Sequence, residues 1–405
     1  MPPSGVTMAV VNEESHKGED AHSCLEHGDV LAYGVFDGHG GKHCSQGIAN
    51  VSGGLSGVLP MILTDGRAAL PEDEVIADAF WTADAQLGAW MLGQPDKSHA
   101  GSTATVLFVA EGATSAERSC LLAWVGDSTA VAVDMHGEGA LAHVTRNHSP
   151  DVEEEIVFLE YLSAVAKLIR RKRKKADGGS GADDDDDDGK GAYLEEPPST
   201  DEVVAATVEV GKQGQPLPAP PLGAAGTLVG LVHRALCREK VIMAHIPKGG
   251  KYRRNVCVYR RPVEKDANQP FAIATTMDPY SSHHRDLQMT RSICDWTKTS
   301  WITPQPEVLR FVVGSHTRVV LASDGLWDVT PHELALQIVR GAATCSDAAD
   351  LLLAHAHRVY CEERGLERPG DDTTVMVVDI NPTGTDFAPP PNRQETESGG
   401  CCAVS

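Results

Sequence analysis

The chain has 405 residues, which is enough for one large domain or two smaller ones. Its formal net charge of −22 argues against nonspecific nucleic-acid binding, because such binding needs Lys and Arg to displace counterions from phosphates. The ten cysteines show no CxxC spacing, and the first residues lack the basic and apolar order of a secretory signal. We therefore expect an intracellular, cytoplasmic protein with reduced thiols.

Short apolar runs rich in Val, each flanked by Gly, Ser or Asp, predict buried strands. In chain order they cover residues 30–36, 103–110, 120–125, 130–133, 317–322 and 373–380. Apolar spacing of three, four or seven predicts helices over residues 71–92, 331–339 and 348–363. Strands occur partly in adjacent pairs and partly with helices between them, which favours a layered α+β architecture.

A segment of different composition interrupts this pattern at residues 164–269. It contains the basic run Arg170 to Lys175, the six aspartates of 183–188 and a Pro-rich stretch at 215–222. Such a composition buries too little apolar surface to offset the entropy of ordering, so we predict that most of it is mobile, with a candidate hairpin within 229–259. The prediction is one domain over residues 1–382 with a low-complexity insertion, followed by an unstructured tail over 383–405.

Carboxylates recur at the ends of the predicted strands or in the turns beside them. Asp37 lies in the sequence DGHGG, and further acids occur at Asp324 and at Asp371-Asp372. A single Asp beside a Gly is usually a turn residue, but three glycines around one Asp and one His are unusual. Oxygen ligands of this kind suit Mg²⁺ and Mn²⁺, so the pattern predicts a site for a pair of divalent cations.

Six motifs in fixed order resemble those of the type 2C, metal-dependent protein phosphatases. They are ED (residues 19–20), VFDGHGG (35–41), GSTA (101–104), GDS (126–128), SDGLWD (323–328) and DDTTV (371–375). The resemblance implies a four-layer sandwich of two antiparallel β-sheets flanked by α-helices. It also implies hydrolysis of phosphoserine and phosphothreonine esters in proteins, by water activated at a pair of Mg²⁺ or Mn²⁺ ions.

The resemblance also assigns roles to single positions. Metal binding falls to Glu19, Asp20, Asp37, Gly38, Asp324 and Asp371. Within that set Asp37 would bridge the two cations, Asp20 would orient a water, and Gly38 would contribute its carbonyl oxygen. His39 stands where the family places its general acid, which protonates the departing Ser or Thr oxygen. GSTA and GDS receive a structural role only.

The sequence departs from the family pattern in three places. Ser15 replaces an Arg that binds substrate phosphate in many members, and Lys17 or His16 is the candidate substitute. Asn147 replaces an acid linked to a third, weaker metal, which we expect near Asn147 and Asp324. Cys294, in TRSICD, stands where the family usually has Gly.

The chain ends in Cys-Cys-Ala-Val-Ser, which is typical of a prenylation box. We expect a prenyl group on Cys402 and a palmitoyl group on Cys401, which together would anchor the protein to a membrane. The basic run Arg170 to Lys175 fits a nuclear-import signal, an anionic-lipid contact or a plain exposed stretch equally well.

Three functions compete at this level. An active phosphatase that acts on phosphoproteins explains why His39 occurs together with the acids. We expect such an enzyme to be a monomer. A pseudophosphatase that binds partners without turnover explains the replaced Arg and Asn147. A metal-dependent phosphodiesterase or nuclease fits poorly with the acidic charge.

Overall fold

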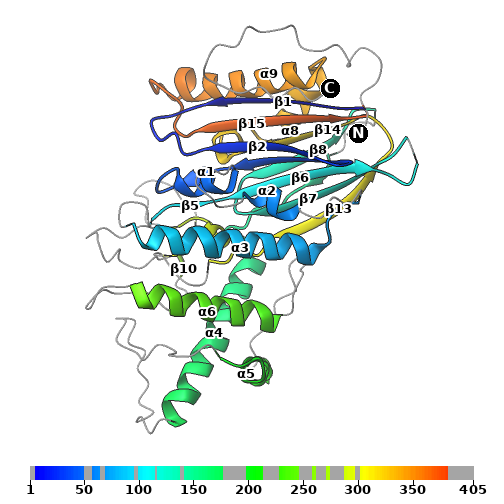
Figure 1. Cartoon of the computed structure of the whole chain (residues 1–405). Helices are drawn as coiled ribbons and strands as arrows, with labels where there is room; N and C mark the ends of the chain where they lie inside the picture. Colours follow the sequence, from blue (N-terminus) through cyan, green and yellow to red (C-terminus); the bar gives the residue numbers. More distant parts are fainter. Residues whose placement is uncertain are drawn as a thin grey trace.

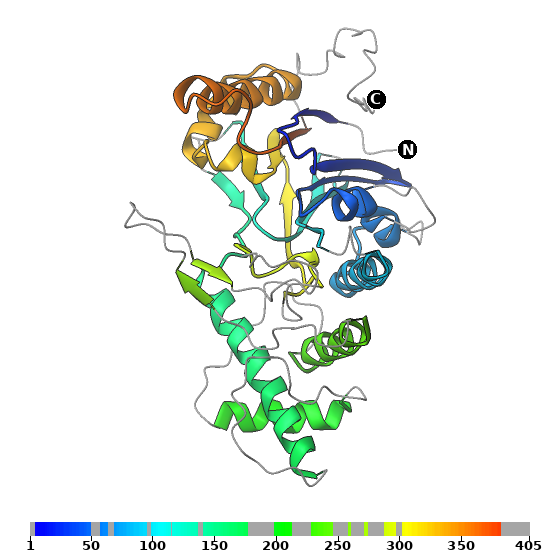
Figure 2. The same ribbon diagram turned by 90° about the vertical axis from the view of Figure 1, so that its left-hand side faces the viewer.

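The computed structural model describes residues 5–49, 57–63, 69–94, 99–114, 116–136, 141–176, 198–212, 228–245, 258–260, 271–273, 287–296 and 302–381. Two five-stranded antiparallel sheets pack face to face (Figures 1 and 2). The first sheet has the order β1 (Val6–Glu13), β15 (Thr373–Ile380), β14 (Thr317–Ala322), β8 (Thr129–Asp134), β9 (Leu141–Val144). The second has the order β13 (Glu307–Val313), β7 (Arg118–Val125), β6 (Ala104–Glu111), β3 (Val30–Phe36), β2 (Ala21–His27).

Helices cover the outer face of each sheet. The second sheet is covered by α1 (His43–Ala49), α2 (Val58–Ile62) and α3 (Asp73–Leu92). The first is covered by α7 (Asp324–Trp327), α8 (His332–Gly341) and α9 (Cys345–Arg358), with the π-helical turn η1 (Val359–Glu363) after α9. Strand β3 is apolar on both of its faces. Leu31 and Tyr33 face the other sheet, while Val30 and Ala32 face the helices. The predicted four-layer α+β sandwich is confirmed.

Two smaller sheets complete the strand pairing. β12 (Ile293–Cys294), β5 (Gly101–Ser102) and β4 (Gly38–His39) form a three-stranded sheet, and β10 (Val258–Arg260) pairs with β11 (Phe271–Ile273). All six predicted strands and all three predicted helices occur, with ends shifted by a few residues. Among the strands of the two five-stranded sheets, β1, β2, β9 and β13 were not predicted. In β2, for example, the polar sequence AHSCLEH at a sheet edge shows no apolar run.

Three helices, drawn in green in Figure 1, lie in the insertion or run into it: α4 (Glu153–Ala176), which begins before residue 164, α5 (Thr200–Lys212) and α6 (Leu228–His245). Its prediction as mostly mobile does not hold for these helices, and α6 replaces the candidate hairpin over much of 229–259. Average composition concealed apolar residues at helical spacing, such as Val165 and Ile169 on α4. These side chains form a core with residues from α5 and α6 and with Trp81 of α3.

The basic run is the C-terminal end of α4, where Arg173 pairs with Glu202 and Lys172 with Glu209 of α5. Within the described part of the chain, no helix combines the length and apolarity needed to cross a bilayer. The aspartates at 183–188, the tail at 383–405 and the expected lipidation sites Cys401 and Cys402 lie outside the described residues.

Two helical glycines predict opposite effects of the same substitution. A Cβ atom on Gly88 of α3 would lie 2.3 Å from the ring of Trp296, whereas a Cβ on Gly211 of α5 would meet nothing within 4 Å. We expect Gly88→Ala to lower the free energy of unfolding by about 1–3 kcal/mol through overpacking. Gly211→Ala should leave it unchanged or raise it by up to about 1 kcal/mol. Urea denaturation of both variants measures this, and equal changes would contradict the packing of Trp296.

Candidate active site

Antiparallel pairing brings the predicted acids to one edge of the sandwich. Ala21 pairs with Phe36, so Asp20 and Asp37 leave adjacent strands side by side. Ala322 pairs with Val375, so Asp324 and Asp371 do the same in the other sheet. Because the sheets lie face to face, the pair Asp20 and Asp37 meets the pair Asp324 and Asp371 at the same edge of the sandwich. Four separate stretches of sequence therefore contribute to this edge.

Asp37 is the centre of this group. The side chains of Asp20, Asp127, Asp324 and Asp371 lie close enough for their charges to act on it. Burial, and after it the charges of Asp324 and Asp20, raise the pKa of Asp37 well above its usual value. Burial and the charges of Asp127 and Asp371 do the same to the pKa of Asp324. Without a cation, these carboxylates therefore retain protons at a pH where exposed aspartates are ionised.

The donor atoms fit divalent cations. One oxygen each of Asp20 and Asp127 is buried without a hydrogen-bond partner. A buried, unpaired carboxylate oxygen is costly, and a hard cation with oxygen ligands would compensate it. The repulsion among Asp37, Asp324 and Asp371 would be relieved in the same way.

Asp127 and Asp328 belong to this acidic group although the sequence analysis gave neither a role in it. Both raise the pKa of Asp324 through their charge. Asp127 follows the end of β7, so the strand-end pattern that marked the other acids could have found it. Asn147, expected near a third metal, is exposed, and its side-chain oxygen accepts a hydrogen bond from Thr129 at 2.9 Å. The acids beside Asp324 are Asp127 and Asp328 instead.

Glu19 is held at the DGHGG turn. Its Oε1 atom accepts a hydrogen bond from the backbone N–H of Gly41 at 2.5 Å, and its backbone carbonyl accepts one from Ser45. A Cβ atom on Gly38 would lie 2.4 Å from that same carbonyl oxygen, so only glycine permits this approach. The turn and Glu19 are thereby packed as one unit beside Asp37.

The two neighbouring acids Asp371 and Asp372 do different work. Asp372 is buried and accepts hydrogen bonds from the backbone N–H groups of Ser15, Gly18 and Glu19, at 2.5–3.2 Å. Burial alone would raise the pKa of Asp372, but hydrogen bonds from Glu19, Ser15 and Gly18 lower it below its usual value. Asp372 therefore fixes the loop that carries Glu19, and leaves Asp371 facing the other acids.

Lys17, one of the two candidates for phosphate binding, lies at the acidic group. Its Nζ atom is 2.6 and 2.7 Å from the two carboxylate oxygens of Asp371. Burial alone would lower the pKa of Lys17, but Asp371, Asp324 and Asp37 raise it. His16, the other candidate, is exposed to solvent. The structure thus places the positively charged ammonium group of Lys17 at the site.

His39 faces a carboxylate that the sequence analysis did not assign to it. The His39 Nε2 atom lies 2.8 and 2.9 Å from the two oxygens of Asp295, which is fully buried, and His39 Nδ1 has no hydrogen-bond partner. Asp295 is the last residue of TRSICD, the motif in which Cys294 stands where the family usually has Gly.

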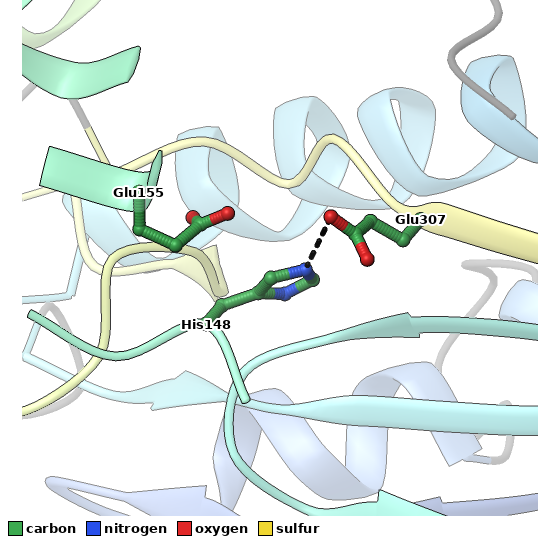
Figure 3. A group of neighbouring side chains, drawn as sticks. All are labelled: His148, Glu155 and Glu307. Atoms are coloured by element: carbon green, nitrogen blue, oxygen red, sulfur yellow. Dashed lines mark ion pairs between the residues drawn. The ribbon is translucent and has the colours of Figure 1, made fainter. Parts of the chain in front are cut away.

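A second cluster of His148, Glu155 and Glu307 has ligand atoms within 4.8 Å of one another (Figure 3). The backbone N–H of Gly126 donates to Nδ1 of His148, so in the neutral ring the proton is on Nε2, which lies 3.7 Å from Glu307. Burial and the charge of Arg291 lower the pKa of His148, which keeps the ring neutral. A protonated Nε2 offers no lone pair to a metal.

Two arginines balance the charge of this cluster. Arg291 donates to both oxygens of Glu155, at 2.5 and 2.9 Å, and Arg146 donates to Glu307 at 2.6 Å. Burial alone would raise the pKa of Glu155, but the charge of Arg291 lowers it. The cluster is therefore a charge-balanced network that ties α4 to β13, and not a metal site.

The acidic group predicts a pH-dependent stability in protein freed of divalent cations. Burial raises the pKa of Asp20 to about 6, against the hydrogen bond from Ser323 that lowers it. A raised folded-state pKa stabilises at low pH, and this contribution is lost as pH rises through about 6. We expect Asp20→Asn, relative to wild type, to gain about 2 kcal/mol in unfolding free energy between pH 4 and 7.

Asp372 provides the control of opposite sign. Because its pKa is lowered, ionised Asp372 stabilises the folded protein at pH values above the ordinary pKa of a carboxyl group. The free energy of unfolding of Asp372→Asn should therefore fall further below that of wild type as pH rises from 3 to 5. Chemical denaturation across pH in the presence of a chelator measures both variants. A pH-independent difference between Asp20→Asn and wild type would contradict the geometry described for Asp20.

Residues 5–160 and 277–365 match the family described as "Protein phosphatase 2C". The chain is 35% identical over 111 residues to "Probable protein phosphatase 2C 5" of Arabidopsis thaliana, a match covering 27% of this chain and 24% of that protein. It is 36% identical over 113 residues to "Probable protein phosphatase 2C 69" of Oryza sativa subsp. japonica, covering 27% and 24%. The matches thus span about a quarter of the length of these relatives.

Solved structures are similar over nearly the whole chain. The serine-threonine phosphatase 2C from Toxoplasma gondii has a TM-score of 0.54 at 17% identity, with 94% of this chain and 97% of that chain covered. A C. elegans sex determining protein has a TM-score of 0.50 at 16% identity, covering 94% and 65%. At this identity the likeness supports the fold. With more than half of its residues matched by the family, this chain belongs to the protein phosphatase 2C family.

Proposed function

We propose that the chain hydrolyses phosphoserine and phosphothreonine esters in proteins, using two Mg²⁺ or Mn²⁺ ions held by the acidic group. The observation that carries this proposal is that Asp37, directly after β3, lies close enough to Asp20, Asp127, Asp324 and Asp371 for the charges of all four to raise its pKa. A carboxylate in that position can bridge two cations, and the unpaired buried oxygens of Asp20 and Asp127 supply further ligand atoms. Membership of the protein phosphatase 2C family supports the same chemistry.

The residues of the chain would divide the remaining work. Bound cations would lower the pKa of an attacking water and offset charge on the phosphoryl oxygens. Lys17, beside Asp371, would exchange that carboxylate for a phosphoryl oxygen of the substrate. His39 would protonate the departing Ser or Thr oxygen. Because its Nε2 atom faces Asp295, the proton given up would be the one on Nδ1.

A second candidate function rests on Ser15 and Lys17. Ser15 is buried, and its backbone N–H donates a hydrogen bond to Asp372. The position that holds a phosphate-binding Arg in many family members therefore has a structural role in this chain. The ammonium group of Lys17 already neutralises Asp371. Both features would suit a scaffold that binds partners without turnover, and activity measurements separate the two functions.

Hydrolysis of p-nitrophenyl phosphate by the purified full chain tests the main proposal. We expect activity that depends on Mn²⁺ or Mg²⁺ and is lost with a chelator. Asp37→Asn and Asp324→Asn should each lower kcat by at least about a hundredfold, because each removes charge from the group that would hold the cations. Asp78→Asn, at an exposed ion pair of α3, is the control. No activity above Asp37→Asn under any metal condition would favour the scaffold.

Substitutions of Lys17 test its proposed role in substrate binding. Loss of a charged contact to phosphate should raise KM about tenfold in Lys17→Met, with a smaller change in kcat. Lys17→Arg should keep KM near or below the wild-type value, because guanidinium binds two phosphate oxygens. Initial rates on a phosphoseryl peptide at saturating Mn²⁺ measure both. A lower KM in Lys17→Met would mean that Lys17 blocks the site.

A further inference from the structure

Residues 290–296, here called the strap, connect the insertion to the candidate site. All seven residues are buried. Strand β12 of the strap pairs with β5, and β5 pairs with β4, which contains His39. The strap therefore lies one strand away from the proposed general acid, and it approaches from the side of the molecule where the insertion helices lie (Figure 2).

Asp295 of the strap contacts His39 directly. Its two oxygens lie 2.8 and 2.9 Å from His39 Nε2, and Ser292 donates to one of them at 2.5 Å. A Cβ atom on Gly101 would lie 2.4 Å from both Asp295 Oδ2 and His39 Nε2, so the pair forms only because β5 has a glycine there. The orientation of the imidazole ring thus depends on where the strap holds Asp295.

The strap holds Asp295 in an unfavourable backbone conformation. Cys294 and Asp295 have φ angles of 71° and 56°, in the left-handed region that side chains with a Cβ atom rarely adopt. Such residues cost about 1–3 kcal/mol each and persist only where neighbouring groups enforce them. The groups that enforce this conformation therefore decide the position of Asp295.

Those groups come from α3 and from α6 of the insertion. The backbone N–H of Cys294 donates to Asp84 at 2.7 Å, and its carbonyl accepts from Arg238 Nη2 at 3.0 Å. Arg238 also pairs with Asp84 at 3.4 Å and lies over the ring of Trp296, 5.5 Å from the centroid. Arg238 is 5% exposed, so these contacts are shielded from water.

Helix α4 holds the other end of the strap. Glu155 accepts a hydrogen bond from Thr290 Oγ1 at 2.7 Å and binds the guanidinium of Arg291 through both oxygens. The strap is thus held at its first two residues by Glu155, which lies on α4 ahead of the insertion, and near its last residues by Arg238 of α6 in the insertion. Neither helix contributes a side chain to the acidic group around Asp37 among the contacts described above.

We propose that the insertion positions His39 through the strap, with Asp295 as the positioning residue and Arg238 of α6 as the contact that sets it. The inference rests on the proposed function, since it assigns the insertion control over the protonation step of that reaction. A partner that moves α6 would change turnover without touching the acids that would hold the cations.

Arg238 and Arg234 form a matched pair for the test. Both lie on α6 and pair with an Asp of α3, Arg234 with Asp78 at 2.6 Å, but Arg238 also contacts the strap. We expect Arg238→Met and Asp295→Asn to lower kcat on a phosphoseryl peptide about 10- to 100-fold, with KM little changed. On p-nitrophenyl phosphate, whose leaving group departs without protonation, both should lose less than about threefold. Arg234→Met should match wild type on both substrates.

The ring of His39 gives a readout that does not need activity. Full-length protein labelled with ¹⁵N-histidine, in the presence of a chelator, is compared by NMR, with His39→Gln assigning the signal. The His39 resonances should shift in Arg238→Met and in Asp295→Asn and stay in place in Arg234→Met. If Arg238→Met does not fold, the near-isosteric Asp295→Asn still tests the contact, and Arg238→Lys tests α6.

The outcomes separate the two proposals. An inactive wild-type protein with the expected NMR shifts would remove the proposed function but keep the structural control of His39. Active wild-type protein with unshifted His39 resonances in Arg238→Met would overturn the inference, as would an equal loss of kcat on both substrates.

Discussion

Mutual repulsion among buried carboxylates is the constraint around which the candidate site is organised. The charges of Asp324 and Asp127 both raise the pKa of Asp37, and the charge of Asp127 also raises that of Asp324. Separate surface acids would move apart, but these are attached to the ends of strands whose positions the sheets fix. The packing of two sheets, with its large apolar core, therefore supplies the free energy that holds like charges together.

The loops of the site are held by hydrogen bonds to groups that take no part in the proposed chemistry. The Asp372 carboxylate accepts hydrogen bonds from three backbone N–H groups and so fixes the loop that carries Lys17 and Glu19. Gly38 permits the close approach of the Glu19 carbonyl. These contacts pre-organise the ligand atoms, which lowers the cost of binding a cation in a defined geometry.

The insertion changes how the domain should be understood. In sequence it separates the two matched parts of the family region, yet Arg238 on its helix α6 contacts residues 290–296, which pair with β5. The buried network of Arg291, Glu155 and Glu307 joins the same residues to the first turn of α4 and to β13. An added segment that is packed in this way can influence the site, because the strained residues Cys294 and Asp295 depend on it.

The sequence by itself determined the layered α+β class and the main strands, and it singled out Asp20, Asp37, Asp324 and Asp371 as candidate metal ligands. It could do so because alternation, strand-end turns and ordered motifs are local properties. It did not determine the order within α4, α5 and α6, whose apolar faces are stabilised only against one another and against Trp81. Nor did it determine that Asp127 joins the acidic group, that Asp372 fixes a loop rather than facing the site, or that Asp295 meets His39. Those outcomes depend on contacts between residues far apart in the chain, which only the packing of sheets and helices brings together.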